Sequence, residues 1–257
     1  MKKLNGVTAI TAAIIMGAGC ATTKVMDASA TSQLRGKHIA CMHCMPVSPL
    51  RLSWAEEVVL QDQILRSQSP AEMLIRGTLI APAVSMDQEQ PVGDDFVTKY
   101  ELEDPAALIE QKIAESLSRQ FQFSRIDYLP GRQSSDAFSP SKAALLAPNA
   151  DCVLLVRTTT WAFLGWLDGL RVTDKYRLVY ECEARFVSIR ERRVLAGTKV
   201  AYDEADHIGN GTSTRPATKH TLLANNAELI RQKLQVAADH CVDVFLDRVV
   251  GTVKITE

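Results

Sequence analysis

The chain has 257 residues, of which 46% are hydrophobic and 23% are charged, so it has enough length and apolar content to build a packed core. Its formal net charge of −1 gives no indication of a nucleic-acid partner or of a partner with an anionic surface. After the first twenty residues, no segment is long and apolar enough to cross a bilayer, which takes roughly 20 consecutive apolar residues.

The first twenty residues have the pattern of an export signal. Lys2 and Lys3 supply a basic start, residues 7–16 form a short apolar run, and residues 17–19 are small. Because Cys20 follows these small residues directly, the segment resembles the signal of bacterial lipoproteins. The resemblance implies that the signal peptide, residues 1–19, is removed, and that Cys20 then carries the lipid that attaches the protein to a bilayer.

The residue after the cysteine bears on the destination. Lipoproteins held at the inner membrane usually carry Asp there, whereas this chain has Ala21. The resemblance therefore implies an anchor in the outer membrane, with the protein on its periplasmic face. The alternative is ordinary secretion, with Cys20 as an unmodified bystander.

Residues 20–37 are polar, small and aperiodic, and they predict a lipidated flexible tether. Residues 38–257 are predicted to form a single periplasmic domain, which begins with a short strand at residues 38–47. Residues 48–69 have a roughly helical period, and residues 71–84 are typical of a strand. An exposed acidic loop is expected at residues 86–95.

A predicted helix begins at Asp104 and Pro105, which supply a side-chain acceptor at the N-cap and a proline in the first turn. Its apolar residues recur at intervals of four and mark one face. They are Ile109, Ile113, Leu117 and Phe121. A loop at residues 130–140 and a short helix at residues 140–146 follow.

The second half of the chain predicts three strands and a final helix. Residues 152–163 are apolar and β-branched, residues 176–186 alternate between apolar and charged, and residues 194–202 return as a third strand. Asn225 and Glu228 predict a capping box. The apolar face of the helix that follows consists of Ile230, Leu234, Ala237, Cys241, Phe245 and Val249.

From residue 71 onward the predicted order is strand, helix, strand, strand, strand, helix. We predict an α/β (α+β) fold, in which a mostly antiparallel sheet packs two main helices on one face.

Two segments also resemble periplasmic domains related to the amino-terminal domain of TolB. Residues 150–156 (ADCVLLV) are similar to the start of the group's second strand, and residues 185–195 are similar to its hairpin. The group includes the curli-export lipoprotein and the lipoprotein activators of peptidoglycan synthases. Because these relatives act by binding and assembly, the resemblance implies no catalytic residues. We therefore expect a protein that is not an enzyme and needs no cofactor.

One cluster of side chains suggests chemistry. His38, Cys41, His43 and Cys44 lie within seven residues, and sulfur and imidazole ligands suit zinc or copper(I). The Cys41-x-x-Cys44 spacing also occurs in thiol-redox pairs. A strand would place these side chains on opposite faces, and buried cysteine is an ordinary core residue. A periplasmic metal-binding or thiol-redox protein is therefore the second functional hypothesis.

The cysteines leave their pairing open. Apart from Cys20 there are five, an odd number in a compartment that permits disulfides, so at least one thiol is expected outside an internal disulfide. They are Cys41, Cys44, Cys152, Cys182 and Cys241. We favour a structural disulfide that joins the first strand to Cys182 or Cys241.

Residues 164–172 connect two predicted strands, yet they contain Trp166, Leu167 and Leu170, with Trp161 close by. Connecting loops normally run over the surface, and tryptophan is enriched at binding hot spots. These four residues form a candidate partner-binding surface, and packing back onto the core is the alternative. The preferred hypothesis is thus an outer-membrane lipoprotein that binds an envelope protein or assembles with copies of itself.

Overall fold

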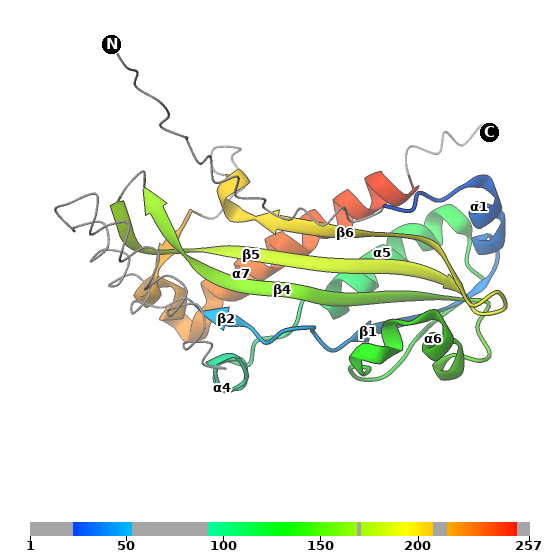
Figure 1. Cartoon of the computed structure of the whole chain (residues 1–257), viewed down its shortest axis with the longest axis horizontal. Helices are drawn as coiled ribbons and strands as arrows, with labels where there is room; N and C mark the ends of the chain where they lie inside the picture. The colour runs from blue at the N-terminus through cyan, green and yellow to red at the C-terminus, as the bar shows by residue number, and fades with distance from the viewer. Residues whose placement is uncertain (1–22, 53–91, 169–170, 208–214, 251–257) are drawn as a thin grey trace, which may run out of the picture.

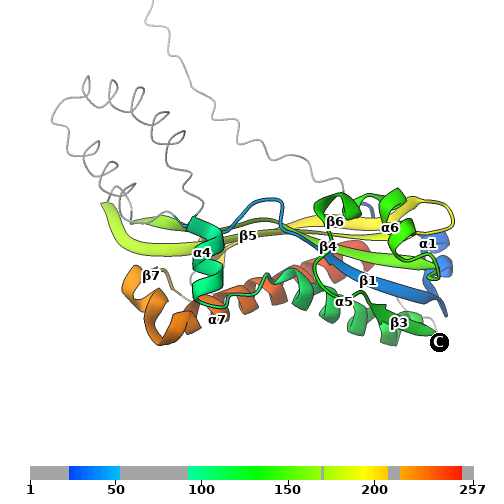
Figure 2. The same cartoon turned by 90° about the horizontal axis from the view of Figure 1, so that it is seen from below.

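The computed structural model describes residues 23–52, 92–168, 171–207 and 215–250. Within these ranges a seven-stranded sheet lies between two helical layers, with α5 and α7 on one face and α6 on the other (Figures 1 and 2). The helices are α1 (Ala28–Leu34), α4 (Val92–Lys99), α5 (Ala106–Phe121), α6 (Pro140–Leu146) and α7 (Lys219–Phe245). The strands are β1 (His38–Cys44), β2 (Arg51–Leu52), β3 (Arg125–Tyr128), β4 (Cys152–Asp168), β5 (Arg171–Ser188), β6 (Arg193–Asp203) and β7 (Ala217–Thr218).

Short helical turns complete these elements, namely η1 (Ser135–Phe138), η2 (Glu204–His207) and the π-helical η3 (Leu246–Val250). The predicted strand at residues 71–84 and most of the predicted helical segment at residues 48–69 lie outside the described residues. The predicted acidic loop at residues 86–95 overlaps the described residues only at its end, where α4 begins at Val92.

The sheet is mixed, so the prediction of a mostly antiparallel sheet is confirmed only in part: the long strands pair antiparallel, and the first strands pair parallel. Its main strand order is β3-β1-β4-β5-β6, with β2 paired to β4 and β7 paired to β5. β1 runs parallel to both β3 and β4, whereas β4, β5 and β6 are antiparallel neighbours. The physical reason is the crossover through α5, which returns the chain to the sheet in the direction of β1.

The two main helices pack on one face as predicted. All four predicted face residues of α5 are buried, as are all six of the last helix. They cover the dry face of β5, where the alternating apolar residues from Tyr176 to Phe186 are buried as well. The rings of Phe186 and Phe245 lie 6.3 Å apart between centroids, which joins β5 to the end of α7.

Of the predicted connecting loop at residues 164–172, residues 164–168 and 171–172 belong to the paired ends of two strands, and residues 169–170 lie outside the described residues. β4 continues to Asp168 and β5 begins at Arg171, and the backbone pairing extends to Leu167 with Val172 and Asp168 with Arg171. The paired ends of β4 and β5 lie at the opposite end of the molecule from α1 (Figure 1).

The part of the predicted flexible tether that the structure describes packs against the domain. Lys24 forms a two-way backbone pair with Gly197 on the edge of β6, with N···O distances of 2.8 and 3.0 Å. The backbone N–H of Met26 donates to the carbonyl of Val249 at 2.8 Å, and Leu34 of α1 is fully buried. Polar, small residues are thus ordered here by backbone hydrogen bonds, which hydrophobic periodicity does not report.

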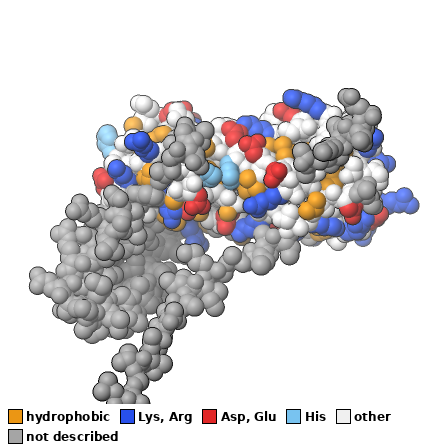
Figure 3. Space-filling view, turned by 90° about the horizontal axis from the view of Figure 1, so that it is seen from above, with side chains coloured by type: hydrophobic (Ala, Val, Ile, Leu, Met, Phe, Trp, Pro, Cys, Tyr) orange, Lys and Arg blue, Asp and Glu red, His pale blue; other side chains and the backbone are white. Residues whose placement is uncertain are grey.

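The surface carries both signs of charge. On the side seen in Figure 3, basic and acidic side chains are interspersed rather than gathered into one patch of a single sign. Salt bridges link the long strands β4, β5 and β6 across their charged face, as in Arg157 with Glu183 at 2.8 Å and Lys199 with Glu181 at 2.6 Å. Among the described residues, no helix combines the length and apolarity needed to span a bilayer.

Candidate functional site

The two cysteines of the predicted metal or redox cluster lie on opposite faces of the sheet. Cys41 is buried in the core shared with α5 and α7, whereas Cys44 is buried in the smaller core beneath η1 and α6. Burial raises the pKa of the Cys44 thiol to about 11 and raises the pKa of Cys41 further still. Both thiols are therefore protonated at neutral pH, and a protonated thiol is a poor nucleophile.

The two histidines of that cluster have separate partners. His38 Nε2 lies 2.8 Å from Asp127 Oδ2, and His38 Nδ1 lies 2.9 Å from the carbonyl oxygen of Asn149. His43 Nδ1 lies 2.7 Å from Glu110 Oε2 on α5. Nowhere in the described ranges do three His, Cys, Asp or Glu side chains group to hold a metal ion. The hypothesis of a metal-binding or thiol-redox protein at this cluster thus gains no support from its geometry.

The expected disulfide from the first strand is not formed. Cys41, Cys44, Cys152, Cys182 and Cys241 are all buried thiols. Cys182 lies on β5, which β4 separates from β1, and its hydrogen-bond partner is Cys241 of α7. The sheet order therefore separates the first strand from Cys182, because β4 lies between β1 and β5.

The predicted partner-binding residues divide into two groups. Trp161 is 2% exposed, and its indole N–H donates to the carbonyl of Ser48 at 3.2 Å, so it is a core residue and offers no binding surface. Trp166 and Leu167 belong to β4, but their side chains lie outside the described residues, as does Leu170 entirely. Cys20 also lies outside the described residues, and its lipidation remains a prediction.

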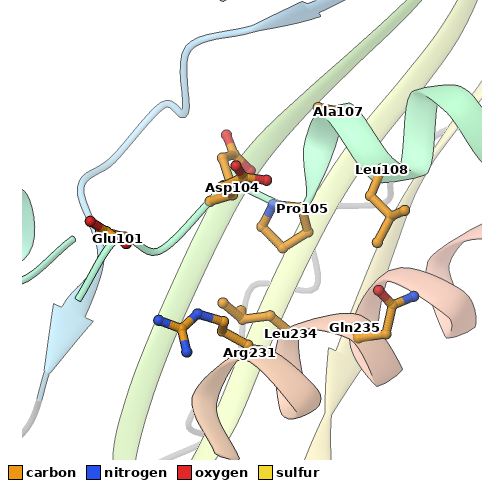
Figure 4. Close-up of a pocket in the computed structure, with 9 residues that line it drawn as sticks. Glu101, Asp104, Pro105, Ala107, Leu108, Arg231, Leu234 and Gln235 are labelled. Atoms are coloured by element: carbon orange, nitrogen blue, oxygen red, sulfur yellow. The ribbon is translucent and has the colours of Figure 1, made fainter. Parts of the chain in front are cut away.

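A pocket that the sequence did not predict lies where the N-terminus of α5 faces α7 (Figure 4). Its volume is about 330 Å³. The polar lining comes from Glu101, Glu103, Asp104, Arg231 and Gln235, and the apolar lining comes from Pro105, Ala107, Leu108 and Leu234. Residues from two elements far apart in the chain thus meet around one space.

Asp104 connects this pocket to the core. It is 4% exposed, and its Oδ1 accepts hydrogen bonds from the backbone N–H of Ala106 at 3.0 Å and from the hydroxyl of Thr158. The Thr158 hydroxyl in turn lies 2.8 Å from the hydroxyl of the fully buried Tyr180. Asp104 Oδ2 is buried and has no hydrogen-bond partner. Burial raises the pKa of Asp104, although both hydrogen bonds favour its carboxylate form.

In the sequence, Asp104 is recognisable only as the start of a helix. That prediction is confirmed in part. Asp104 Oδ1 accepts from the backbone N–H of Ala106, the first residue of α5, but Pro105 and not Asp104 occupies the N-cap position. The burial and missing hydrogen-bond partner of its Oδ2 cannot be predicted from the sequence, because a helix-capping Asp and a ligand-binding Asp have the same local sequence pattern. Arg231 likewise occupies an ordinary polar position of an amphipathic helix.

No family model matches the chain, and a search of curated proteins finds no relative. Similar solved structures include the PelC dodecamer from Paraburkholderia phytofirmans, which shares 9% identity over 84% of this chain and 88% of that chain, with a TM-score of 0.35. Protein XCC0632 from Xanthomonas campestris shares 12% identity over 88% of this chain and 93% of that chain, with a TM-score of 0.34.

Lipoprotein GNA1162 from Neisseria meningitidis is also similar, with 13% identity over 80% of this chain and 98% of that chain and a TM-score of 0.26. Likenesses this weak carry no argument about activity, partner or location. Function is therefore argued from the residues of the chain itself.

Proposed function

We propose that the chain is a lipoprotein of the cell envelope, anchored by Cys20 in the outer membrane, whose periplasmic domain acts by binding or assembly and not by catalysis. The export pattern of residues 1–19 and the position of Cys20 support the anchor. The resemblance of residues 150–156 and 185–195 to domains that act by binding supports the second part.

The structural observation that carries the proposal is the docking of the segment that follows Cys20. Besides the backbone pair of Lys24 with Gly197, the hydroxyls of Thr23 and Thr198 lie 2.9 Å apart. Lys24 is four positions after Cys20, and an extended chain spans at most about 3.6 Å per residue, so the attachment point lies within roughly 14 Å of Lys24. A lipid on Cys20 would hold this edge of the sheet beside the bilayer.

The proposal is tested by changing the cysteine and its neighbour in the full chain and fractionating the cells. Cys20→Ser should release the protein into the soluble periplasm or leave an uncleaved precursor, whereas Ala21→Ser should stay in the membrane fraction as the matched control. Ala21→Asp should move the protein from the outer to the inner membrane. Normal maturation and unchanged membrane attachment of Cys20→Ser would overturn the anchor.

A further inference from the structure

The pocket between α5 and α7 has the size of a site for a small ligand or for one long side chain. Its volume of about 330 Å³ is at the lower end of the range for small-molecule sites, which starts at roughly 300 Å³. Leu108 of α5 and Leu234 of α7 supply apolar lining, one from each helix (Figure 4). Such a space fits an aliphatic stem that ends in a polar group.

The charge of the lining selects the sign of that polar group. Three acidic residues line the pocket, Glu101, Glu103 and Asp104, against the single basic residue Arg231. The Arg231 guanidinium already donates to the carbonyl of Tyr100 at 2.9 Å and pairs with Glu228 at 3.4 Å.

Neither glutamate in the lining has such a partner. Glu101 and Glu103 are exposed, and no basic side chain among the described residues pairs with either of them. The helix N-terminus by itself would favour an anion, but the three carboxylates around it reverse that preference.

Asp104 supplies the acceptor. Its Oδ1 is fully used by Ala106 and Thr158, while its Oδ2 is buried and unpaired. A buried oxygen without a partner destabilises the protein, more so when it is charged, and a donor placed against it removes that cost. A charged donor gains most, because hydrogen bonds between ionised groups are roughly twice as strong as neutral ones.

We propose that this pocket binds an ammonium or guanidinium group, which donates to Asp104 Oδ2 while Glu101 and Glu103 attract it from the mouth. Leu108 and Leu234 pack against the aliphatic stem of the same ligand. The bound group is either the lysine or arginine side chain of a partner polypeptide or the end of a free amine. The inference does not rest on the lipid anchor, so it stands or falls separately from the proposed function.

The test titrates the full mature chain, purified in detergent, with probes that differ only in the terminal group. N-acetyl-lysine amide should bind saturably, whereas the uncharged N-acetyl-norleucine amide of similar shape should bind at least tenfold more weakly. Equal binding of the two probes, or saturable binding of neither, would overturn the proposal. A lysine flanked by two glycines on each side should bind more tightly than the amide if the source is a polypeptide, and equally if it is a free amine.

Variants assign the binding to this pocket. Asp104→Asn keeps the shape and the acceptor for Ala106 but removes the charge, so it should weaken the lysine probe at least tenfold. Because Asp104 is buried, Glu101→Gln with Glu103→Gln provides a second variant at exposed positions, where a loss of severalfold is expected. Glu115→Gln is the matched control, since it removes one exposed carboxylate of α5 that does not line the pocket. Unchanged affinity in both pocket variants would overturn the assignment.

Discussion

The two carboxyl oxygens of Asp104 differ, because one forms hydrogen bonds within the fold and the other has no partner. Its Oδ1 joins the first turn of α5 to the hydroxyls of Thr158 and Tyr180 on β4 and β5. Its Oδ2 has no partner, and burial raises its pKa. The carboxyl is therefore costly to ionise in the folded protein, which gives it a measurable effect on stability.

The sign of that effect follows from linkage. Because the pKa of Asp104 is higher in the folded than in the unfolded chain, the folded state binds a proton more readily as the pH falls. The contribution of Asp104 to stability therefore increases as the pH falls through the folded pKa, and it levels off below the unfolded value of about 3.9.

Asp104→Asn removes this titration. The free energy of unfolding of the wild type, relative to that of Asp104→Asn, should rise between pH 7 and pH 4, with a slope of at most about 1.4 kcal/mol per pH unit. Urea unfolding at several pH values measures the difference, with Glu115→Gln as the exposed comparison. A difference that is constant with pH, or that falls toward pH 4, would show that Asp104 is not held in this way.

At the scale of elements, α7 shows a conflict between local pattern and tertiary structure. The helix begins after Thr218, whose side chain accepts from the backbone N–H of Thr221, and it is interrupted at Ala224–Ala227. Asn225 has a φ of 50°, in the left-handed region, whereas an N-cap residue has extended backbone. The predicted capping box at Asn225 and Glu228 is therefore wrong.

The apolar face of α7 after this interruption determines stability. Phe245 is 1% exposed and packs against Phe186, and truncating such a side chain typically costs about 3–5 kcal/mol. Phe245→Ala should lower the free energy of unfolding by about that amount. Gln232→Ala, at an exposed position of the same helix, should change it by less than about 0.5 kcal/mol. Equal losses in urea unfolding would mean that this end of α7 is not part of the core.

Helices and strands with a strong hydrophobic repeat could be predicted from the sequence, but the elements that they pack against or pair with could not. The spacing of four in α5 and the alternation in β5 each identify a buried face, because burial requires a repeat that matches the geometry of the element. β3 has only four residues, which are half-buried or exposed, so it carries no such repeat. The sequence of a strand also does not indicate whether its neighbours run parallel or antiparallel to it, so the parallel pairing of β1 could not be predicted.

The same distinction applies to the candidate site. Cys41 and Cys44 are three positions apart in one strand. Because side chains alternate between the two faces of a strand, this odd spacing places the two thiols on opposite sides of the sheet. Asp104 and Arg231 are far apart in sequence and line one pocket. Only the packing of α5 against α7 brings them together, and that packing is a property of the whole fold.

At the scale of the whole molecule, the docked tether and the β4–β5 hairpin mark two separate regions. Lys24 pairs with Gly197 on the edge of β6, opposite Arg185 of β5. From Arg185 to Val172 there are 13 residues of β5, which at about 3.3 Å per residue is roughly 43 Å along the strand. An anchor at Cys20 therefore leaves the end of the hairpin well removed from the attachment point.

This placement gives the hairpin end a role that can be tested. Trp166 and Leu167 belong to the end of β4, and Leu170 directly precedes β5 in the sequence. An exposed apolar patch on a domain surface usually marks an interaction site. If these side chains are exposed, Trp166→Ser with Leu170→Ser should leave the melting temperature nearly unchanged and reduce partner capture or self-association in crosslinked envelopes. Leu145→Ser, at a side chain of α6 that is 69% exposed, is the matched control and should change neither.

The two readouts on one double mutant separate the alternatives. If the hairpin end folds back onto the core, the substitutions create a cavity and bury hydroxyl groups, so the melting temperature should fall by several degrees before any effect on binding is seen. A large loss of stability would therefore contradict the interaction surface. A stable double mutant that captures as much partner and self-associates as well as the wild type would contradict it equally, because the apolar residues would then contribute to neither folding nor binding.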